Sequence, residues 1–388
     1  MKGKSPEALS ISLQRKRTLK TFQSLHIEKM EMHHIRHPYT RAFCFCALLV
    51  VVGCGSNPFQ TGGITPPVTS PSNPPPSNPP TTGSPSGVTE PTVYVMGGSA
   101  SESILVFPQP AIERVNSILE IPGGQVSLDG AGNVYVLAGA SINEYSATSL
   151  NGPPTRSLFV GPGTSVSNVQ DVMASSTGEI FVSDGNGIAV FSSTAAGNAS
   201  PLRYILRPPQ STGGTMPVFR PGLITVDSSD NVYVQNASDS SISVYGPTDT
   251  GNVNPARKIS GPLTRVSGAS NYITAMTTDT VGNLYVLCVC MGTDGSGRYD
   301  FGVFEFDPAA NGNVAPSRLV TASDMYPYFF NDGVGVSPDG TIYVSAGTPQ
   351  GKPTVFEFSS SSSGSVTPSK TISWDGWTNA DPSRIAVH

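Results

Sequence analysis

Aromatic side chains that could take part in recognition gather in two short segments, MYPYFFND at 325–332 and SWDGW at 373–377. Exposed tyrosine and tryptophan rings beside charged groups are typical of binding surfaces, because the ring face is apolar and its neighbours supply polar contacts. A third segment, CMGTDGSGRYDF, adds an arginine within a long insertion. The candidate ligand-binding residues are therefore Tyr326, Tyr328, Phe330, Asp332, Trp374, Trp377 and Arg298. The alternative is that these rings seal the fold.

Residues for acid–base catalysis are scarce. His388 is the single histidine after position 53, so a Ser-His-Asp triad or a multi-histidine metal site would have to be built on this one residue. We therefore assign no catalytic residue from the sequence.

Two thiols lie close together in the segment YVLCVC, at Cys288 and Cys290. Alternate residues of a strand point to the same face, and neighbours of this kind do not bridge easily. We expect two small, buried apolar side chains rather than a disulfide, a metal site or a redox pair.

A repeated strand motif organises the chain from Thr92 onward. Each copy alternates apolar and polar residues around an aromatic residue and a valine, and turn-forming residues separate the copies. The spacing of the copies fits four-stranded propeller blades. The six copies are VYV at 93–95, GNVYV at 132–136, GEIFV at 178–182, DNVYV at 230–234, GNLYV at 282–286 and GTIYV at 340–344.

Three further strands accompany the motif in most copies. A second strand follows it, as in ILVF from 104 and VFEF from 303. An inner strand precedes it, with apolar residues at Val126, Val172, Ile224, Met276 and Val334. The outer strand carries a basic residue, which we expect on an exposed edge where charge discourages aggregation. These basic residues are Arg156, Arg203, Arg257, Arg318 and Lys370.

The first copy lacks an inner strand of its own, because the linker precedes it directly. The final segment SRIAVH matches LITVD, with Ile385 in the apolar position, so we expect this C-terminal strand to complete the first blade. The predicted fold class is all-β: a six-bladed β-propeller of four-stranded antiparallel blades, in which the C-terminal strand closes the first blade.

The combined pattern, D-x-x-G-N-aliphatic-Tyr-Val followed by Ile-x-Val-Phe, resembles the NHL-type propellers of bacterial lipoproteins and covers residues 92–388. Propellers of this shape serve as binding platforms, lyases and lactonases. Six-bladed propellers similar to gluconolactonases hold calcium with inward Glu, Asn and Asp, whereas the inner strands here are mostly aliphatic or small. Asp171 and Asp332 are the nearest candidate ligands, and we favour turn capping for both.

Residues 1–53 are predicted to be a lipoprotein-type signal peptide, because a basic segment precedes an apolar run too short to span a bilayer comfortably. The sequence VVGCGSN resembles a lipobox, which implies cleavage before Cys54 and lipidation of that residue; ordinary secretion is the alternative. Residues 54–91 are rich in proline and poor in large apolar side chains, so we expect a disordered tether.

Beyond position 53 the chain holds thirteen basic and twenty-four acidic residues, which argues against a nucleic-acid partner. We expect a monomeric, exported lipoprotein of the cell envelope, anchored in the outer membrane by lipid alone. It would present residues 92–388 to a protein, peptide or glycan of the envelope, without catalysis or a cofactor. One alternative is a metal-dependent lactonase or lyase that holds calcium in the propeller channel, and another is an assembly protein whose ring is a rigid spacer.

Overall fold

The computed structural model describes residues 92–96, 103–107, 119–161, 164, 166, 168–184, 186–206, 221–236, 240–267, 271–291, 299–325, 332–348, 353–373 and 383–388. Every described residue belongs to one compact unit, Gly83–His388. The predicted signal peptide, Cys54 and the predicted tether lie outside the described residues.

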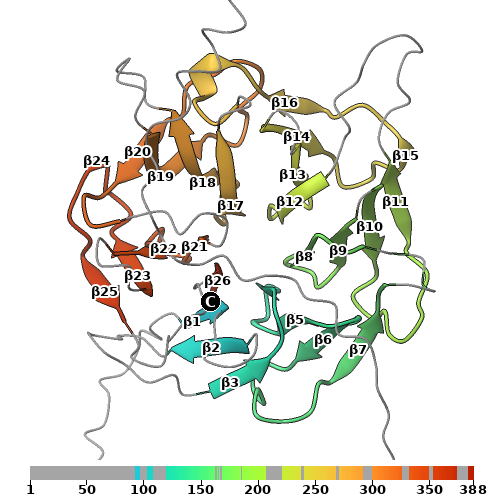
Figure 1. Cartoon of the computed structure of the whole chain (residues 1–388). Helices are drawn as coiled ribbons and strands as arrows, with labels where there is room; N and C mark the ends of the chain where they lie inside the picture. Colours follow the sequence, from blue (N-terminus) through green and yellow to red (C-terminus); the bar gives the residue numbers. More distant parts are fainter. Residues whose placement is uncertain are drawn as a thin grey trace, which may run out of the picture. The chain divides into compact units, whose positions relative to one another are not determined.

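Six antiparallel sheets follow one another around a common centre, as the colour order in Figure 1 shows. From the innermost strand outward, blade 1 is β26 (Ser383–Val387), β1 (Val93–Met96), β2 (Ser103–Phe107) and β3 (Leu119–Pro122), and blade 2 is β4 (Val126–Leu128), β5 (Val134–Ala138), β6 (Ser141–Tyr145) and β7 (Arg156–Phe159). Blade 3 is β8 (Asp171–Ala174), β9 (Ile180–Ser183), β10 (Gly187–Phe191) and β11 (Arg203–Leu206), and blade 4 is β12 (Pro221–Val226), β13 (Val232–Asn236), β14 (Ser241–Tyr245) and β16 (Arg257–Ile259). Blade 5 is β17 (Tyr272–Thr278), β18 (Leu284–Met291), β19 (Tyr299–Phe306) and β20 (Arg318–Thr321), and blade 6 is β21 (Gly333–Val336), β22 (Ile342–Gly347), β23 (Pro353–Phe358) and β25 (Lys370–Ile372). The predicted all-β, six-bladed propeller is therefore confirmed.

The alternation in the repeated motif arises because each blade is covered on both faces. In β1, the Tyr94 side chain packs against Val126 and Val134 of blade 2. Its neighbours Val93 and Val95 point the other way and pack with blade 6. The aromatic residue of every motif thus fills the space toward the next blade, and burial of such rings is a main source of stability in cores of this kind.

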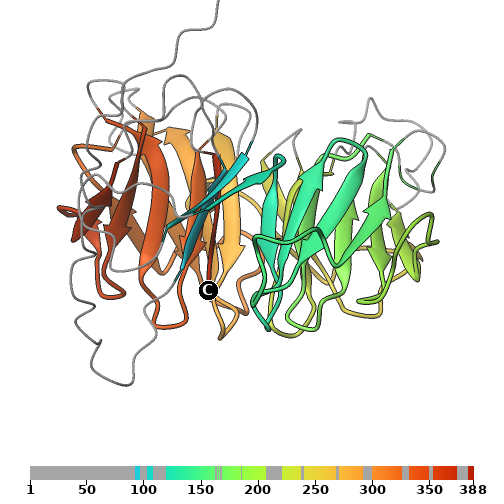
Figure 2. The same cartoon turned by 90° about the horizontal axis from the view of Figure 1, so that it is seen from below.

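The C-terminal strand closes the ring as predicted. β26 pairs antiparallel with β1, and Ile385 lies opposite Val95. The Thr92 backbone N–H donates to the His388 carbonyl at 2.6 Å, and the His388 N–H donates back to Thr92 at 3.1 Å. In Figure 2 the C-terminus lies at the end of the ring where the inner strands finish. The inner strands contact one another in the cyclic order β26, β4, β8, β12, β17 and β21.

Short parallel bridges tie each of four consecutive blades to the blade before it. β15 (Gly251–Asn252) joins β11, β24 (Gly364–Ser365) joins β20, and isolated bridges link Leu158 with Gly197 and Ile259 with Gly312. We call these bridges the glycine clasps. The four glycines have φ between 60° and 76°, a left-handed conformation that other residues adopt only at a cost. The sequence motif GNxxP therefore begins an inter-blade contact and not only an outer strand.

Cys288 and Cys290 form a disulfide within β18, so the prediction that they stay unbridged is wrong. Residues two apart in a regular strand are separated by about 6.6 Å. Here the Cα atoms are only 5.5 Å apart, within disulfide range, and the pairing of β17 with β18 shifts register beside Cys288. Both side chains are buried, as predicted.

Within the part of the chain that the structure describes, no helix has the length and apolar character needed to cross a membrane.

Candidate functional site

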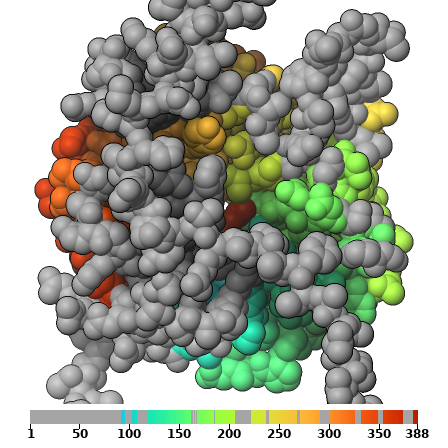
Figure 3. Space-filling view, viewed as in Figure 1, coloured from blue at the N-terminus to red at the C-terminus, as the bar shows by residue number. Residues whose placement is uncertain are grey.

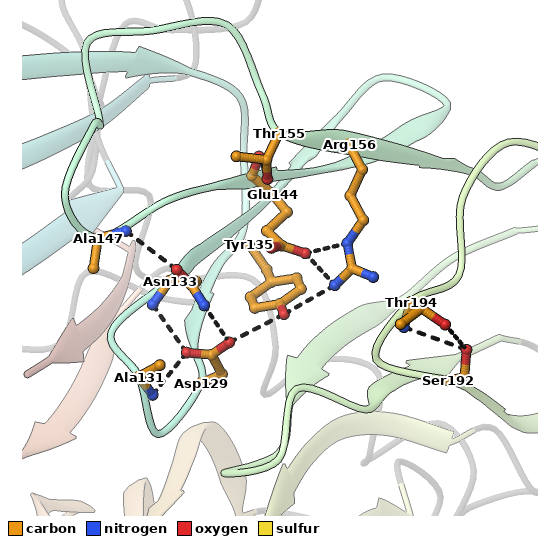
Figure 4. A network of polar contacts seen from close by, with 10 residues as sticks. All are labelled: Asp129, Ala131, Asn133, Tyr135, Glu144, Ala147, Thr155, Arg156, Ser192 and Thr194. Atoms are coloured by element: carbon orange, nitrogen blue, oxygen red, sulfur yellow. Dashed lines mark hydrogen bonds and ion pairs between the residues drawn. The ribbon is translucent and has the colours of Figure 1, made fainter.

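The most conspicuous polar residues of the repeat build a turn network, shown for blade 2 in Figure 4. The Asp129 carboxylate accepts hydrogen bonds from the backbone N–H groups of Ala131 and Asn133 at 2.9 Å each. It also accepts from the Asn133 side chain at 2.8 Å and from the Tyr135 hydroxyl at 3.2 Å. Asp227 and Asp279 repeat this arrangement in blades 4 and 5. These three aspartates therefore cap the turns that follow the inner strands of their blades.

The arginines of the outer strands extend this network instead of lining an exposed edge. In blade 5, Arg318 donates to Glu305 at 2.6 Å and lies over the Tyr285 ring at 6.0 Å. Arg257 of blade 4 donates to the Tyr233 hydroxyl at 3.1 Å, and Arg156 of blade 2 pairs with Glu144. The expected exposed placement is therefore wrong for these arginines, because each guanidinium donates to a tyrosine hydroxyl and to a carboxylate or a carbonyl.

Three of the outer-strand arginines also connect neighbouring blades. Arg203 donates to the Asp249 carbonyl at 2.9 Å, Arg257 to the Ala310 carbonyl at 3.0 Å and Arg318 to the Ser362 carbonyl at 3.2 Å. Each acceptor lies in the blade that follows. Arg203, Arg257 and Arg318 are thus structural contacts between blades, whereas Arg156 and Lys370 pair with Glu144 and Glu357 of their own blades.

Asp171 is the most deeply buried carboxylate of the channel-lining strands, and it joins three blades. It opens β8, and its side chain accepts from the Ile224 N–H of blade 4 at 2.8 Å. It also pairs with Arg384 of β26 at 2.7 Å. Burial raises the pKa of the Asp171 carboxyl above its ordinary value, although the Arg384 guanidinium opposes the shift. Asp171 therefore caps a strand of another blade and balances an arginine, and the prediction of simple turn capping was incomplete.

The calcium alternative gains no support from the described residues. Among them, no group of three or more His, Cys, Asp or Glu side chains lies close enough to hold a metal ion. Asp171 is already occupied by Arg384. Asp332, just before β21, is buried and has an interaction of its own.

The predicted recognition residues fall mostly outside the described part of the chain. This holds for the aromatic candidates and the arginine, namely Tyr326, Tyr328, Phe330, Trp374, Trp377 and Arg298. Asp332 is the one predicted residue that is described. In the sequence, Asp332 directly precedes the inner strand β21. Figure 3 views the ring as in Figure 1, with atoms of the C-terminal strand visible near its centre.

Sequence analysis missed two exposed apolar side chains in the connection between β16 and β17. Leu263, in the 3₁₀ turn η1 (Pro262–Thr264), is 58% exposed, and Tyr272 at the start of β17 is 49% exposed. Between them, Arg265 pairs with Asp300 and lies over the Phe304 ring at 5.2 Å. Asn271 donates to the Arg265 carbonyl at 2.8 Å. The sequence did offer one signal for these residues. They lie in a connection that leads from an outer strand into an inner strand, and the predicted aromatic segments are connections of the same kind.

No family model and no curated protein sequence matches this chain. Among solved structures, it is similar to a protein of unknown function from Bacteroides caccae, with 14% identity and a TM-score of 0.51, over 77% of this chain and 99% of the other. It is also similar to a chain of a nidogen–laminin complex, with 15% identity and a TM-score of 0.47, over 76% of this chain and 98% of the other. At such identity the first likeness supports the propeller fold alone.

Proposed function

We propose that this chain is a non-catalytic, lipid-anchored protein of the cell envelope that binds a protein, peptide or glycan through one face of its propeller. The proposal includes an NHL-type propeller, a signal peptide that ends at residue 53 and lipidation of Cys54. The binding face would be the end of the ring where the inner strands begin.

The observation that carries the proposal is the pair of exposed side chains Leu263 and Tyr272 beside the Arg265–Asp300 ion pair. These residues lie at the end of blade 5 where β18 ends and β19 begins. Apolar area next to a fixed charge pair is the composition of an interface centre with a polar rim. By contrast, the repeated Asp, Tyr and Arg residues are used within and between blades.

Export is supported by the Cys288–Cys290 disulfide. Disulfides persist in oxidising compartments such as the bacterial periplasm and are rare in reducing cytosol. The lipid anchor itself rests on the sequence around Cys54. Mass spectrometry of the amino-terminal peptide tests it, since Cys54→Ser would abolish an acylated product and leave the protein in the soluble envelope fraction.

The binding function is tested by affinity capture from envelope extracts with the full-length protein, followed by identification of bound proteins and glycans. We expect a specific partner whose capture falls in Tyr272→Ala and in the Trp374→Ala/Trp377→Ala double variant. Val281→Ala is the control, because Val281 is also an exposed apolar side chain but lies in the turn after β17, at the other end of the ring.

Three results would contradict the proposal. One is equal capture of the partner by the parent, by Tyr272→Ala and by Trp374→Ala/Trp377→Ala, provided that circular dichroism shows both variants to be folded. Another is loss of capture in the Val281→Ala control. A third is turnover of a lactone that chelation of divalent metal abolishes, which would favour the enzymatic alternative.

A further inference from the structure

The end of the ring where the inner strands finish contains a cavity of about 320 Å³. All six blades line it, through their inner strands and the turns that follow. Val387 and His388 contribute from the closing strand of blade 1 and its end. The cavity lies opposite the face proposed above for macromolecular binding, so its occupant would not compete with that partner.

The wall of the cavity offers apolar surface that a side chain can reach. Five apolar lining residues, one from each of five blades, are only partly buried although they belong to inner strands. They are Val387, Leu128, Met173, Val226 and Val336. Water is a poor environment for such surface, and covering it with another apolar group is favourable. The cavity therefore suits an aliphatic side chain.

The chain joins the propeller beside this cavity. Thr92 is the first described residue, and it exchanges two backbone hydrogen bonds with His388, at 2.6 Å and 3.1 Å. His388 itself lines the cavity. β1 then runs away from this end, antiparallel to β26. The chain that precedes Thr92 is therefore attached at the cavity end of the ring, one strand spacing of about 4.8 Å from the innermost strand of blade 1.

The sequence GVTEP at 87–91 places one aliphatic side chain within reach of the cavity, that of Val88. An extended chain spans at most about 3.6 Å per residue, so Val88 lies within about 14 Å of Thr92. The next aliphatic residue toward the amino terminus is Val68, which is far more distant in the sequence. Glu90 precedes a proline and so favours an extended or polyproline II conformation, in which residues three apart, such as Val88 and Pro91, share one side.

We infer that residues 87–91 fold back over this end of the ring and insert Val88 into the cavity. Val88 would pack against Val387 of blade 1 and against the apolar residues of the blades on either side, Leu128 and Val336. One consequence rests on the proposed function, because it requires the lipid anchor. The anchored segment would leave the ring at the end opposite the binding face, so that face would be turned away from the membrane. The disordered tether would then be limited to residues 54–86.

The inference is tested by NMR on the full-length protein with isotopically labelled methyl groups. We expect nuclear Overhauser contacts between the Val88 methyl groups and those of Leu128, Val336 or Val387. Val88→Ser should shift the methyl resonances of these three cavity residues, because serine cannot cover the apolar wall. Val68→Ser is the matched control, since it makes the same substitution in the same proline-rich region, and it should leave these resonances unchanged.

Two results would overturn the inference. One is the lack of any contact between the Val88 methyl groups and the methyl groups of the cavity. The other is an equal shift of the cavity resonances, or no shift at all, in Val88→Ser and Val68→Ser. These measurements require neither the binding partner nor the lipid. Failure here would therefore leave the binding function standing, and failure of affinity capture would leave the docking of Val88 standing.

Discussion

At the scale of single residues, the arginine of the outer strand does more than its sequence context indicates. Arg318 contacts Glu305, the Tyr285 ring and carbonyl groups of blade 6 at once. A planar guanidinium can satisfy several acceptors in fixed directions, whereas an ammonium is a single point charge. This explains why arginine occupies most of these positions.

Arg318→Met should lower the free energy of unfolding by about 2–3 kcal/mol, because it leaves Glu305 half-buried without its cation. Arg318→Lys should lower the free energy of unfolding by about 1 kcal/mol, since lysine keeps the charge but lacks the planar set of donors of the guanidinium group. Urea denaturation of the three proteins measures both values. A loss below about 0.5 kcal/mol in Arg318→Met would restore the view that this residue is an exposed edge charge.

The buried tyrosines of the same networks predict alkaline sensitivity. Burial raises the pKa of Tyr233 and of Tyr285 above the ordinary value of 10.0. The folded state therefore retains these protons longer than the unfolded state, so their stabilising contribution is complete below about pH 10 and is lost as the pH rises beyond it. In the parent protein we expect tyrosinate absorbance to rise together with the loss of the circular dichroism signal as the pH increases. In the double variant Tyr233→Phe/Tyr285→Phe, the free energy of unfolding should differ less between pH 8 and pH 11 than it does in the parent. The same narrowing in the control Tyr272→Phe, a half-exposed ring, would contradict this assignment.

At the scale of elements, the glycine clasps convert a row of sheets into a linked ring. Each clasp adds backbone hydrogen bonds to the exposed edge of an outer strand, as where Gly312 donates to the Lys258 carbonyl at 2.8 Å and accepts from the Ser260 N–H at 3.0 Å. A covered strand edge cannot pair with another molecule. The clasps therefore take over the protective role that the sequence had led us to assign to the basic residues.

Gly312→Ala tests a clasp by backbone conformation alone. No atom lies within 4 Å of the position that the new Cβ would occupy, so steric overlap does not contribute. The φ of 71° should cost an alanine about 1–2 kcal/mol, while Gly312→Asn should cost less because asparagine tolerates this region. Thermal unfolding of both variants gives the comparison, and equal stability of alanine and glycine here would show that the clasp does not require the left-handed conformation.

At the scale of the whole molecule, closure depends on a pair of charges as well as on strand pairing. Arg384 comes from blade 1 and Asp171 from blade 3, and their ion pair at 2.7 Å spans β4 of blade 2. Removing one partner of a buried pair is far more costly than removing both. The ion pair therefore favours the one position of β26 in which Arg384 reaches Asp171.

Arg384→Met should destabilise the protein by about 3–5 kcal/mol at neutral pH, and Asp171→Asn/Arg384→Met by clearly less. The pKa of Asp171 is already raised by burial, and loss of the guanidinium raises it further. A raised carboxyl pKa stabilises the folded state at low pH and loses that effect as the pH rises through the folded value, so Arg384→Met should be more stable at pH 5 than at pH 8. Denaturant unfolding at the two pH values measures this difference. If Arg384→Met lowered the free energy of unfolding equally at both pH values, the result would argue against a charged Asp171.

The sequence alone predicted the blades, their number and the closing strand, because these depend on local alternation and on a motif repeated six times. It could not predict the partners of Arg318, since these lie in the turn of the following blade. The Asp171–Arg384 pair was likewise hidden by the distance between the two residues in the chain. The exposure of Leu263 and Tyr272 depends on how one connection crosses blade 5, and periodicity carries no information on this.

The position of β26 has a consequence for biosynthesis. Among the described strands, the ribosome synthesises β1 first and β26 last. β1 therefore cannot pair with its inner neighbour β26 until every other blade has been translated. Under the proposed export in an unfolded state, the ring would be complete only after Ile385 has crossed the membrane. Products terminated before Ser383 would keep an unpaired edge on β1, and unpaired strand edges can pair with other molecules.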